Sequence, residues 1–293
     1  MLSATGRRRS DSVKASVGGF VEVVAGGDTD TLQAFIRDGL PDSAHVGAQL
    51  EAWGWRPNVL ASRCVQFVSG TSTVGLAVRG RVLRFIGDAD AIVAALPGLM
   101  DADTGALMGT MQTLDRAQRA LPAGQLRWID VWEARRNAVP RGLVSVPTDA
   151  QLSSFAIASF DAFEEEVGSP PAPRHLDEDY LALWWRRAAE GLVLGAWVSN
   201  RCVFRVEVRP VLGITAELRG VWLAPDLRGR GLAHRYLRDA IDLVGGRFGG
   251  NVQLLATEDN VRASRLYQSM GLQMRATLGR YDLELSRSAG DAR

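Results

Sequence analysis

The sequence is poor in the features that mark secreted, membrane-spanning and nucleic-acid-binding chains. It has only two cysteines, Cys64 and Cys202, which lie too far apart for a metal-binding motif or a disulfide framework. No stretch approaches the roughly 18 apolar residues that a membrane span needs. The 34 basic and 33 acidic residues nearly cancel, so the net charge of +1 provides no field that favours nucleic acid. We therefore expect a cytoplasmic protein with two buried thiols and neither a membrane nor a nucleic-acid partner.

An export signal is also missing. Arg7, Arg8 and Arg9 imitate its basic start, but no apolar segment follows them, so we expect residues 1–16 to be a disordered tail. The remainder is long enough for two domains. The polar, proline-ended segment 135–140 is the best linker. We expect domains at 17–138 and 139–288 and a short tail at 289–293.

Residue patterns in the second half predict a mixed α/β fold. The expected strands are 143–146, 192–198, 202–208, 214–223 and 252–257, with a hairpin turn at Ser199-Asn200. The expected helices are 147–166, 177–190, one that begins after Gly231, and 261–270. A proline-rich loop at 168–173 separates the first two helices.

A glycine-rich loop joins one of these strands to a helix. Residues 227–233 read LRGRGLA, and Gly229 and Gly231 permit backbone conformations that a Cβ would disfavour. The helix behind the loop supplies free N–H groups and the positive end of its dipole. Arg228 and Arg230 add charge, so the loop is a candidate seat for a phosphate or pyrophosphate.

Two common phosphate loops do not fit this stretch. A Walker loop needs a lysine after the glycines, and a dinucleotide fingerprint needs a small residue where His234 stands. The pattern Arg-x-x-Gly-x-Ala, present as Arg228, Gly231 and Ala233, does fit. It resembles the acyl-coenzyme A motif of the GNAT superfamily of N-acetyltransferases. A purely structural glycine loop is the alternative.

A second block strengthens the resemblance. Asn260, Ala263, Tyr267 and Gly271 match the family's pattern N-x-x-A-x-x-x-Y-x-x-x-G, which precedes its last two strands. Asn260 is a suitable N-cap and Gly271 a suitable helix end. The resemblance covers roughly residues 140–288.

The resemblance implies an acyltransferase that uses acetyl-CoA. The acyl chain would lie between two parallel strands that splay apart, here 214–223 and 252–257. Tyr267 would protonate the leaving thiolate. The implied cofactor-binding residues are Val221, Trp222, Leu223, Arg228, Gly229, Arg230, Gly231, Leu232, Ala233 and Asn260.

The residue patterns of the first half predict strands and helices in the order of an acetyltransferase fold, but without the anion-binding loop. Its expected strands are 20–24, 65–68, 74–78, 81–86 and 126–132, and its expected helices are 28–38, 41–53, 89–96 and 104–120. Residues 87–90 read GDAD, whose carboxylates would repel a pyrophosphate. We therefore expect tandem GNAT-like domains with a degenerate first copy. An unrelated α/β cap is the alternative.

Strand geometry suggests two candidates for a general base. Antiparallel pairing across the loop 210–213 would place Glu207 near Glu217, and Arg205 near Arg219. A carboxylate on these strands could accept the proton of the attacking amine. An exposed ladder of ion pairs is the alternative reading.

The expected acceptor wall combines the acidic residues 164–166 with Tyr180, Trp184 and Trp185, which suits a cationic amine. These residues could equally be a solvated helix end and core aromatics. We expect direct acetyl transfer, through a tetrahedral intermediate, to a primary amine of a small molecule. Two further functions are open: acetylation of protein or peptide amines, and non-catalytic binding of acyl-CoA as a sensor or scaffold. A homodimer is also open.

Overall fold

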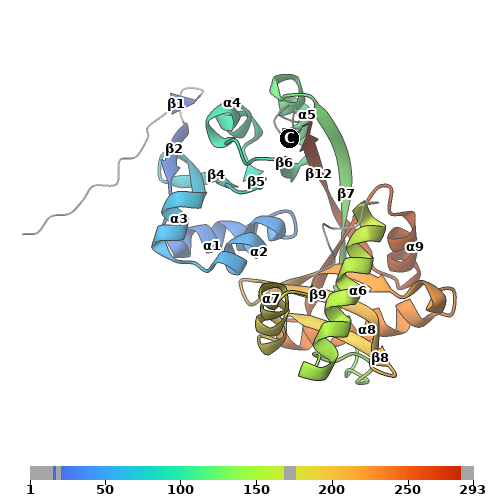
Figure 1. The fold of residues 1–293 in the computed structure, drawn as a ribbon. Coiled ribbons are helices and arrows are strands. Elements are labelled where there is room, and N and C mark those ends of the chain that lie inside the picture. The colour runs from blue at the N-terminus through green and yellow to red at the C-terminus, as the bar shows by residue number, and fades with distance from the viewer. Residues whose placement is uncertain (1–15, 18–20, 168–175, 285–293) are drawn as a thin grey trace, which may run out of the picture. The chain divides into compact units, whose positions relative to one another are not determined.

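The computed structural model describes residues 16–17, 21–167 and 176–284 (Figure 1). The expected proline-rich loop at 168–173, the expected tail at 289–293 and nearly all of the expected N-terminal tail lie outside these residues. Within the described part, no helix combines the length and the apolar character that crossing a bilayer requires.

The chain forms two compact units. The first comprises Met1–Val46, Trp53–Arg127 and Gly279–Arg293, and the second comprises Gly47–Ala52 and Trp128–Leu278. Each contains a mixed sheet with helices, so the predicted α/β class is confirmed.

In the first unit the strand order is β1-β2-β3-β4-β5-β6. The strands are antiparallel to their neighbours from β1 to β5, whereas β5 and β6 are parallel. The strands are β1 (Ser16–Val17), β2 (Val21–Ala25), β3 (Cys64–Ser69), β4 (Ser72–Val78), β5 (Val82–Gly87) and β6 (Ala106–Thr110). The helices are α1 (Thr29–Asp38), α3 (Pro57–Arg63), α4 (Ala89–Leu99) and α5 (Met111–Ala117), followed by the 3-10 turn η1 (Gln118–Ala120). Helix α2 (Ala44–Trp53) is divided between the units, because its residues Gly47–Ala52 belong to the second.

The helix predicted over 104–120 is wrong in its first part. Residues Ala106–Thr110 form strand β6, and the helix α5 begins only after Thr110, whose hydroxyl accepts a hydrogen bond from the Thr113 N–H. Four of the five residues of β6 are buried. A strand that is covered on both faces reads as a continuous apolar run, which resembles a buried helix in the sequence.

In the second unit the strand order is β12-β7-β11-β10-β9-β8. Strands β10 and β11 are parallel, while β7 with β11, β9 with β10, and β8 with β9 are antiparallel. The strands are β7 (Gly124–Arg135), β8 (Val193–Val198), β9 (Arg201–Val211), β10 (Thr215–Leu223), β11 (Asn251–Thr257) and β12 (Gln273–Leu283). The helices are α6 (Asp149–Val167), α7 (Glu178–Ala189), α8 (Leu232–Arg247) and α9 (Val261–Ser269), with the 3-10 turn η2 (Pro225–Leu227) after β10.

Most local predictions for this unit are confirmed. The turn between β8 and β9 has φ of 48° at Ser199 and 64° at Asn200, as a tight hairpin turn requires. Asp177 caps α7. The strand expected at 143–146 is reduced to a single bridge between Ser145 and Gly195.

Strands β7 and β12 each contribute to both units. Residues Ile129–Arg135 of β7, expected to close the first domain, pair with β11 of the second unit. The last part of β12, Gly279–Leu283, belongs to the first unit, where β12 neighbours β6. The predicted boundary at 138/139 therefore differs from the division between the units, which falls within β7. Only one of the two strands expected after α9, namely β12, follows it among the described residues.

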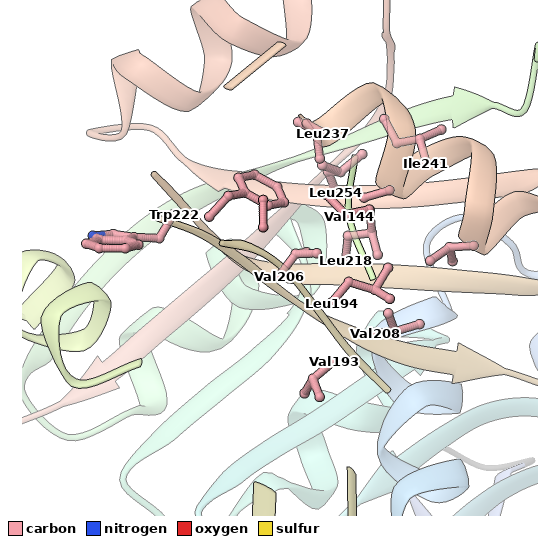
Figure 2. Close-up of a cluster of buried hydrophobic side chains, with 14 of the residues drawn as sticks. Val144, Val193, Leu194, Val206, Val208, Leu218, Trp222, Leu237, Ile241 and Leu254 are labelled. Atoms are coloured by element: carbon pink, nitrogen blue, oxygen red, sulfur yellow. The ribbon is translucent and has the colours of Figure 1, made fainter. Parts of the chain in front are cut away.

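The sheet of the second unit has one apolar face, which packs on α8. Figure 2 shows Leu237 and Ile241 of α8 close to Leu254 of β11 and to Val144. Leu218 and Val208 continue this face across β10 and β9, because residues directly paired across strands point to the same side. The opposite face carries polar side chains and is covered by α6 and α7, since Arg205 of β9 lies over the rings of Phe155 and Trp184.

Two buried aspartates of α8 hold the segment that was expected to be a linker. Asp239, only 3% exposed, accepts hydrogen bonds from the backbone N–H groups of Arg141, Leu143 and Val144. Asp242 accepts from those of Asn137 and Ala138. Residues 137–144 are thus fixed to the helix that follows the glycine loop.

We predict that Asp239→Ala lowers the free energy of unfolding by about 2–4 kcal/mol. An orphaned buried donor costs roughly 1–3 kcal/mol, which applies in full to the N–H of buried Val144, whereas the N–H groups of half-buried Leu143 and exposed Arg141 can turn to water at smaller cost. Asp242→Ala, which removes two acceptor contacts instead of three, has a smaller effect. The exposed Asp115→Ala is the control and stays close to wild type. Thermal and urea unfolding followed by circular dichroism measure the three changes; equal effects for Asp239→Ala and Asp115→Ala would contradict this role.

Candidate active site

The parallel strands β10 and β11 part before they end. Their pairing runs from Thr215 with Asn251 to Leu218 with Leu254 and then stops. Strand β10 continues to Leu223, and β11 continues to Thr257. Beyond Leu218, β10 remains paired with β9 through an irregularity between Arg219 and Trp222. The strands therefore diverge along the stretch that contains Val221, Trp222 and Leu223, as a site for an extended acyl chain requires.

The glycine loop follows directly. Gly229 and Gly231 have φ of 75° and 72°, and a Cβ added to either would meet no atom within 4 Å in the described structure. The glycines thus serve the left-handed backbone conformation and leave open space above it. Gly231 is the N-cap of α8 and provides no side-chain hydrogen bond to the helix. The first N–H groups of α8, at Leu232 and Ala233, therefore have no side-chain cap, which suits an anion.

The two arginines of the loop differ in their surroundings. Arg228 donates from Nη1 to Glu165 Oε1 at 2.8 Å, from Nη2 to Oε2 at 2.5 Å, and from Nε to the Leu223 carbonyl at 2.9 Å. Arg230 is exposed and has no hydrogen bond or ion pair within the described residues. The expectation that both arginines are free for a phosphate holds only for Arg230, because Glu165 neutralises Arg228.

Glu165 connects three elements. Besides Arg228 it accepts hydrogen bonds from Arg262 of α9, at 2.7 Å, and from Trp222 Nε1, at 3.2 Å. The hydrogen bond from Arg228 is the main reason why the pKa of Glu165 is below its ordinary value. Nothing in the sequence spacing links 165 to 228, so this contact could not be predicted.

A surface cleft of about 370 Å³ surrounds this cluster. It is lined by Asp161, Glu164, Glu165, Arg201, Trp222, Pro225 and Arg228. Two of the three acidic residues that were expected to form an acceptor wall, Glu164 and Glu165, thus line the same cleft as Arg228 of the loop.

Tyr267, the predicted proton donor, is a buried residue of helix α9. Its helix α9 begins at Asn260, whose side chain accepts a hydrogen bond from the Ala263 N–H at 3.1 Å. Tyr267 is 3% exposed, and its ring meets that of Trp132 edge-on with 6.1 Å between centroids. Burial raises the pKa of its phenol well above the ordinary value, so the hydroxyl stays protonated at neutral pH.

Tyr267 and the two glutamates lie on opposite faces of the sheet. Trp132, which contacts Tyr267, is paired with Leu254, and Leu254 with Leu218, so these side chains share the apolar face. Glu217 precedes Leu218 and points to the other face. A group held where β10 and β11 diverge could be approached from both faces, so the two predicted roles are compatible.

The predicted pairing of the glutamates is wrong by two residues. Glu217 lies opposite Arg209, and Arg219 lies opposite Glu207. Strand β9 continues to Val211, and only Leu212, Gly213 and Ile214 form the loop, with positive φ at Leu212 and Gly213. The tighter turn shifts the register so that each glutamate faces an arginine.

The two glutamates also differ in their environment. Glu207 contacts Arg205 and, at 3.1 Å, Arg187. Burial alone would raise the pKa of Glu207, but these two guanidinium groups outweigh it and hold the pKa below its ordinary value. Glu217 is 1% exposed and contacts Arg219. A carboxylate with a lowered pKa is a weak proton acceptor, which counts against Glu207 as a base.

The aromatic residues of the expected acceptor wall are mostly core. Tyr180 stacks on Phe160 with 4.6 Å between ring centroids, and Trp184 is buried against Phe155. Trp185 is exposed. The core interpretation therefore applies to Trp184 and largely to Tyr180.

Comparison with protein families gives a match that lies within the second unit. Residues 159–272 match the model of the acetyltransferase (GNAT) family. This part of the chain is a GNAT domain. It contains the glycine loop, α9 and both strands that diverge.

Solved structures with the GNAT fold match most of the chain. A GCN5-related N-acetyltransferase from Sphaerobacter thermophilus is 16% identical, with a TM-score of 0.56 over 91% of this chain and 96% of that one. A GNAT-family acetyltransferase from Colwellia psychrerythraea is 12% identical, with a TM-score of 0.55 over 90% and 99%. At these identities the likeness shows the fold alone. A search of curated proteins found no match.

The lowered pKa of Glu207 makes its contribution to stability depend on pH. Ionised Glu207 stabilises the fold above its unfolded pKa, and this contribution is lost as the pH falls through the lower folded value. We predict that Glu207→Gln melts well below wild type at pH 7, because Arg187 and Arg205 lose their carboxylate. The difference narrows as the pH is lowered from about 4.5 to 3.

Thermal unfolding of both proteins between pH 3 and 7 measures the difference. Glu258→Gln, at an exposed position, is the matched control and stays near wild type throughout. A gap between Glu207→Gln and wild type that is constant over the whole pH range would show that charge on Glu207 does not matter.

Proposed function

We propose that the protein is an acetyl-CoA-dependent N-acetyltransferase that acetylates a primary amine of a small molecule. The observation that carries this proposal is the divergence of β10 and β11 beside an open glycine loop at the start of α8. Together they provide an elongated opening with anion-binding N–H groups at one end. Membership of the GNAT family in residues 159–272 supports the reaction class.

The residues present fit coenzyme A. Its pyrophosphate would bind at Gly229–Ala233, where the N–H groups of the first turn of α8 have no side-chain cap. Arg230 would add charge. Val221–Leu223 would offer backbone groups to the pantetheine arm, and the exposed Asn260 its side-chain amide.

Two side chains of this chain would move protons. The thioester supplies an activated acetyl group and a thiolate leaving group. Tyr267, neutral at pH 7, can donate its proton to that thiolate. Glu217 can accept the proton of the amine, directly or through water. Because Glu217 is 1% exposed, a small amine can approach it more readily than the surface of a folded protein, which favours a small acceptor.

We predict that the full chain binds one coenzyme A, measured by titration calorimetry. Stoichiometry is one because the corresponding turn of the first unit carries Asp88, which caps α4 by accepting from the Ala91 N–H at 2.8 Å and thereby occupies that helix start. Arg230→Ala weakens binding about 10- to 100-fold, the value of one charge-assisted hydrogen bond. The exposed Arg119→Ala of η1 is the control. Unchanged affinity in Arg230→Ala would show that this arginine does not touch the ligand.

We predict that Tyr267→Phe lowers kcat by on the order of 10²-fold while the Kd for coenzyme A changes little. The hydroxyl makes no hydrogen bond among the described residues, so its removal leaves packing intact. Tyr281→Phe is a matched control: it is equally buried, and its hydroxyl donates to the Pro122 carbonyl in the first unit. Thiol release from acetyl-CoA across a panel of amines is the assay. Full activity in Tyr267→Phe would remove this residue from the mechanism.

A further inference from the structure

The polar face of the second unit carries more cations than anions. Arg187 of α7, Arg205 and Arg209 of β9, and Arg219 of β10 lie around two carboxylates of the described chain, Glu207 and Glu217. Cross-strand pairing and side-chain contacts bring all six together on the face under α6 and α7. Glu133, further along the same cross-strand row, pairs with Arg275. The charge of this face is thus positive, whereas the sequence suggested an acidic acceptor site.

The contacts show which cation is left over. Both oxygens of Glu207 are taken, Oε1 by Arg205 and Oε2 by Arg187. Glu217 contacts Arg219. Arg209 has no ion pair and no hydrogen bond within the described residues, although it lies opposite Glu217 in the sheet.

Arg209 is also unfavourably placed as a cation without a contacting counter-ion. It is half-buried, and burial followed by the neighbouring Arg219 charge lowers its pKa from the ordinary value, although the charges of Glu217 and Glu207 act in the opposite direction. An unpaired charge in such a position is costly, so native structures pair it with a counter-ion. No described side chain provides one at contact distance.

Further donors on the same face are unused. The Nε atoms of Arg205 and Arg187 are buried and make no hydrogen bond in the described part of the chain. Arg205 itself is 3% exposed. Buried guanidinium N–H groups without acceptors are rare, and an incoming acceptor would satisfy them.

The surplus charge lies next to the opening between β10 and β11. Glu217 is paired with Gln253 one step before the last paired residues, Leu218 and Leu254. Arg209 is directly opposite Glu217. An anion held by Arg209 would therefore lie beside the candidate base and close to the place where the strands diverge.

We propose that this face binds an anionic group of the acceptor, so that the amine to be acetylated belongs to a molecule that also carries a carboxylate or a phosphate. Arg209 is the specificity-determining residue, with Arg205 and Arg187 as additional donors. The inference rests on the proposed acetyltransferase function for its substrate, but the anion site can be tested without turnover.

The first experiment measures anion binding by the full chain. Inorganic phosphate and acetate are titrated into wild type, Arg209→Gln and Arg275→Gln and followed by calorimetry at low salt. Arg275 is a matched control because it is a strand arginine of the same unit that pairs with Glu133 at 3.3 Å. We expect Arg209→Gln to bind at least one of the two anions about 10-fold more weakly than wild type, and Arg275→Gln to bind both normally. Phosphate that binds at the glycine loop contributes equally to all three. Equal binding by all three proteins overturns the proposal.

Melting temperature separates a ligand site from a structural one. Removal of an unpaired half-buried charge leaves the melting temperature of Arg209→Gln equal to or above that of wild type. A marked fall would show that Arg209 stabilises the fold and would contradict the proposal. Arg209→Lys keeps the charge, and it retains part of the anion affinity that Arg209→Gln loses.

The second experiment compares acceptors in matched pairs: amino acids against their carboxamides, and phosphoethanolamine against ethanolamine. Wild type prefers the anionic member of at least one pair, and which pair responds tells carboxylate from phosphate. Arg209→Gln raises KM for that member about 10-fold or more relative to the change in KM for its neutral partner. Equal use of both members of every pair overturns the inference while the acetyltransferase function stands. No thiol release with any amine, together with anion binding that depends on Arg209, overturns the acetyltransferase function and the acceptor assignment.

Discussion

The candidate site depends on one interruption of backbone hydrogen bonding. Parallel strands β10 and β11 are paired only as far as Leu218 and Leu254. Beyond that point β10 stays paired with β9 at Trp222 and Leu223, while its other edge no longer pairs with β11. The released edge leads into the glycine loop and the start of α8. The apolar face below it carries Tyr267, and the polar face carries Glu217. Without the divergence, these groups would be separated by a continuous sheet.

Two strands, β7 and β12, do not follow the division of the chain into a first and a second half. Strand β7, encoded before the expected linker, completes the sheet of the second unit next to β11, and β12 ends in the first unit. Asp239 and Asp242 of α8 hold the connecting residues 137–144. Trp132 of β7 also supplies the ring that packs against Tyr267. A cut at 138/139 would therefore remove part of the candidate site from the second half. That the first unit is a degenerate GNAT copy stays a prediction. It is based on the order of strands and helices, which is similar in the two halves of the chain.

Local features of the sequence predicted much of this architecture. The glycine loop, the Asn260 cap, the Ser199-Asn200 turn and the α/β class all follow from short-range spacing, which the backbone alone dictates. The strand at Ala106–Thr110 was missed because complete burial removes the period of two. The register of β9 with β10 was missed because it depends on whether the turn begins after Val208 or after Val211, and one such step moves every cross-strand contact. The pairing of Glu165 with Arg228 joins residues far apart in sequence, so no pattern could reveal it.

The arginines of the site divide according to their counter-ions. Arg228 is neutralised by Glu165, a partly exposed carboxylate that also binds Arg262, so this pair is screened by solvent and gives up its partner at small cost. A pyrophosphate arriving at the loop could therefore compete for Arg228, with Glu165 retaining Arg262. Among the residues that the structure describes, Arg209 makes no ion pair that an anion would have to break. Its charge is already exposed to whatever enters the polar face, so an anion there gains attraction without first breaking an ion pair. At the loop, an anion would therefore replace Glu165 as the partner of Arg228. On the sheet, an anion would bind Arg209 without replacing a carboxylate.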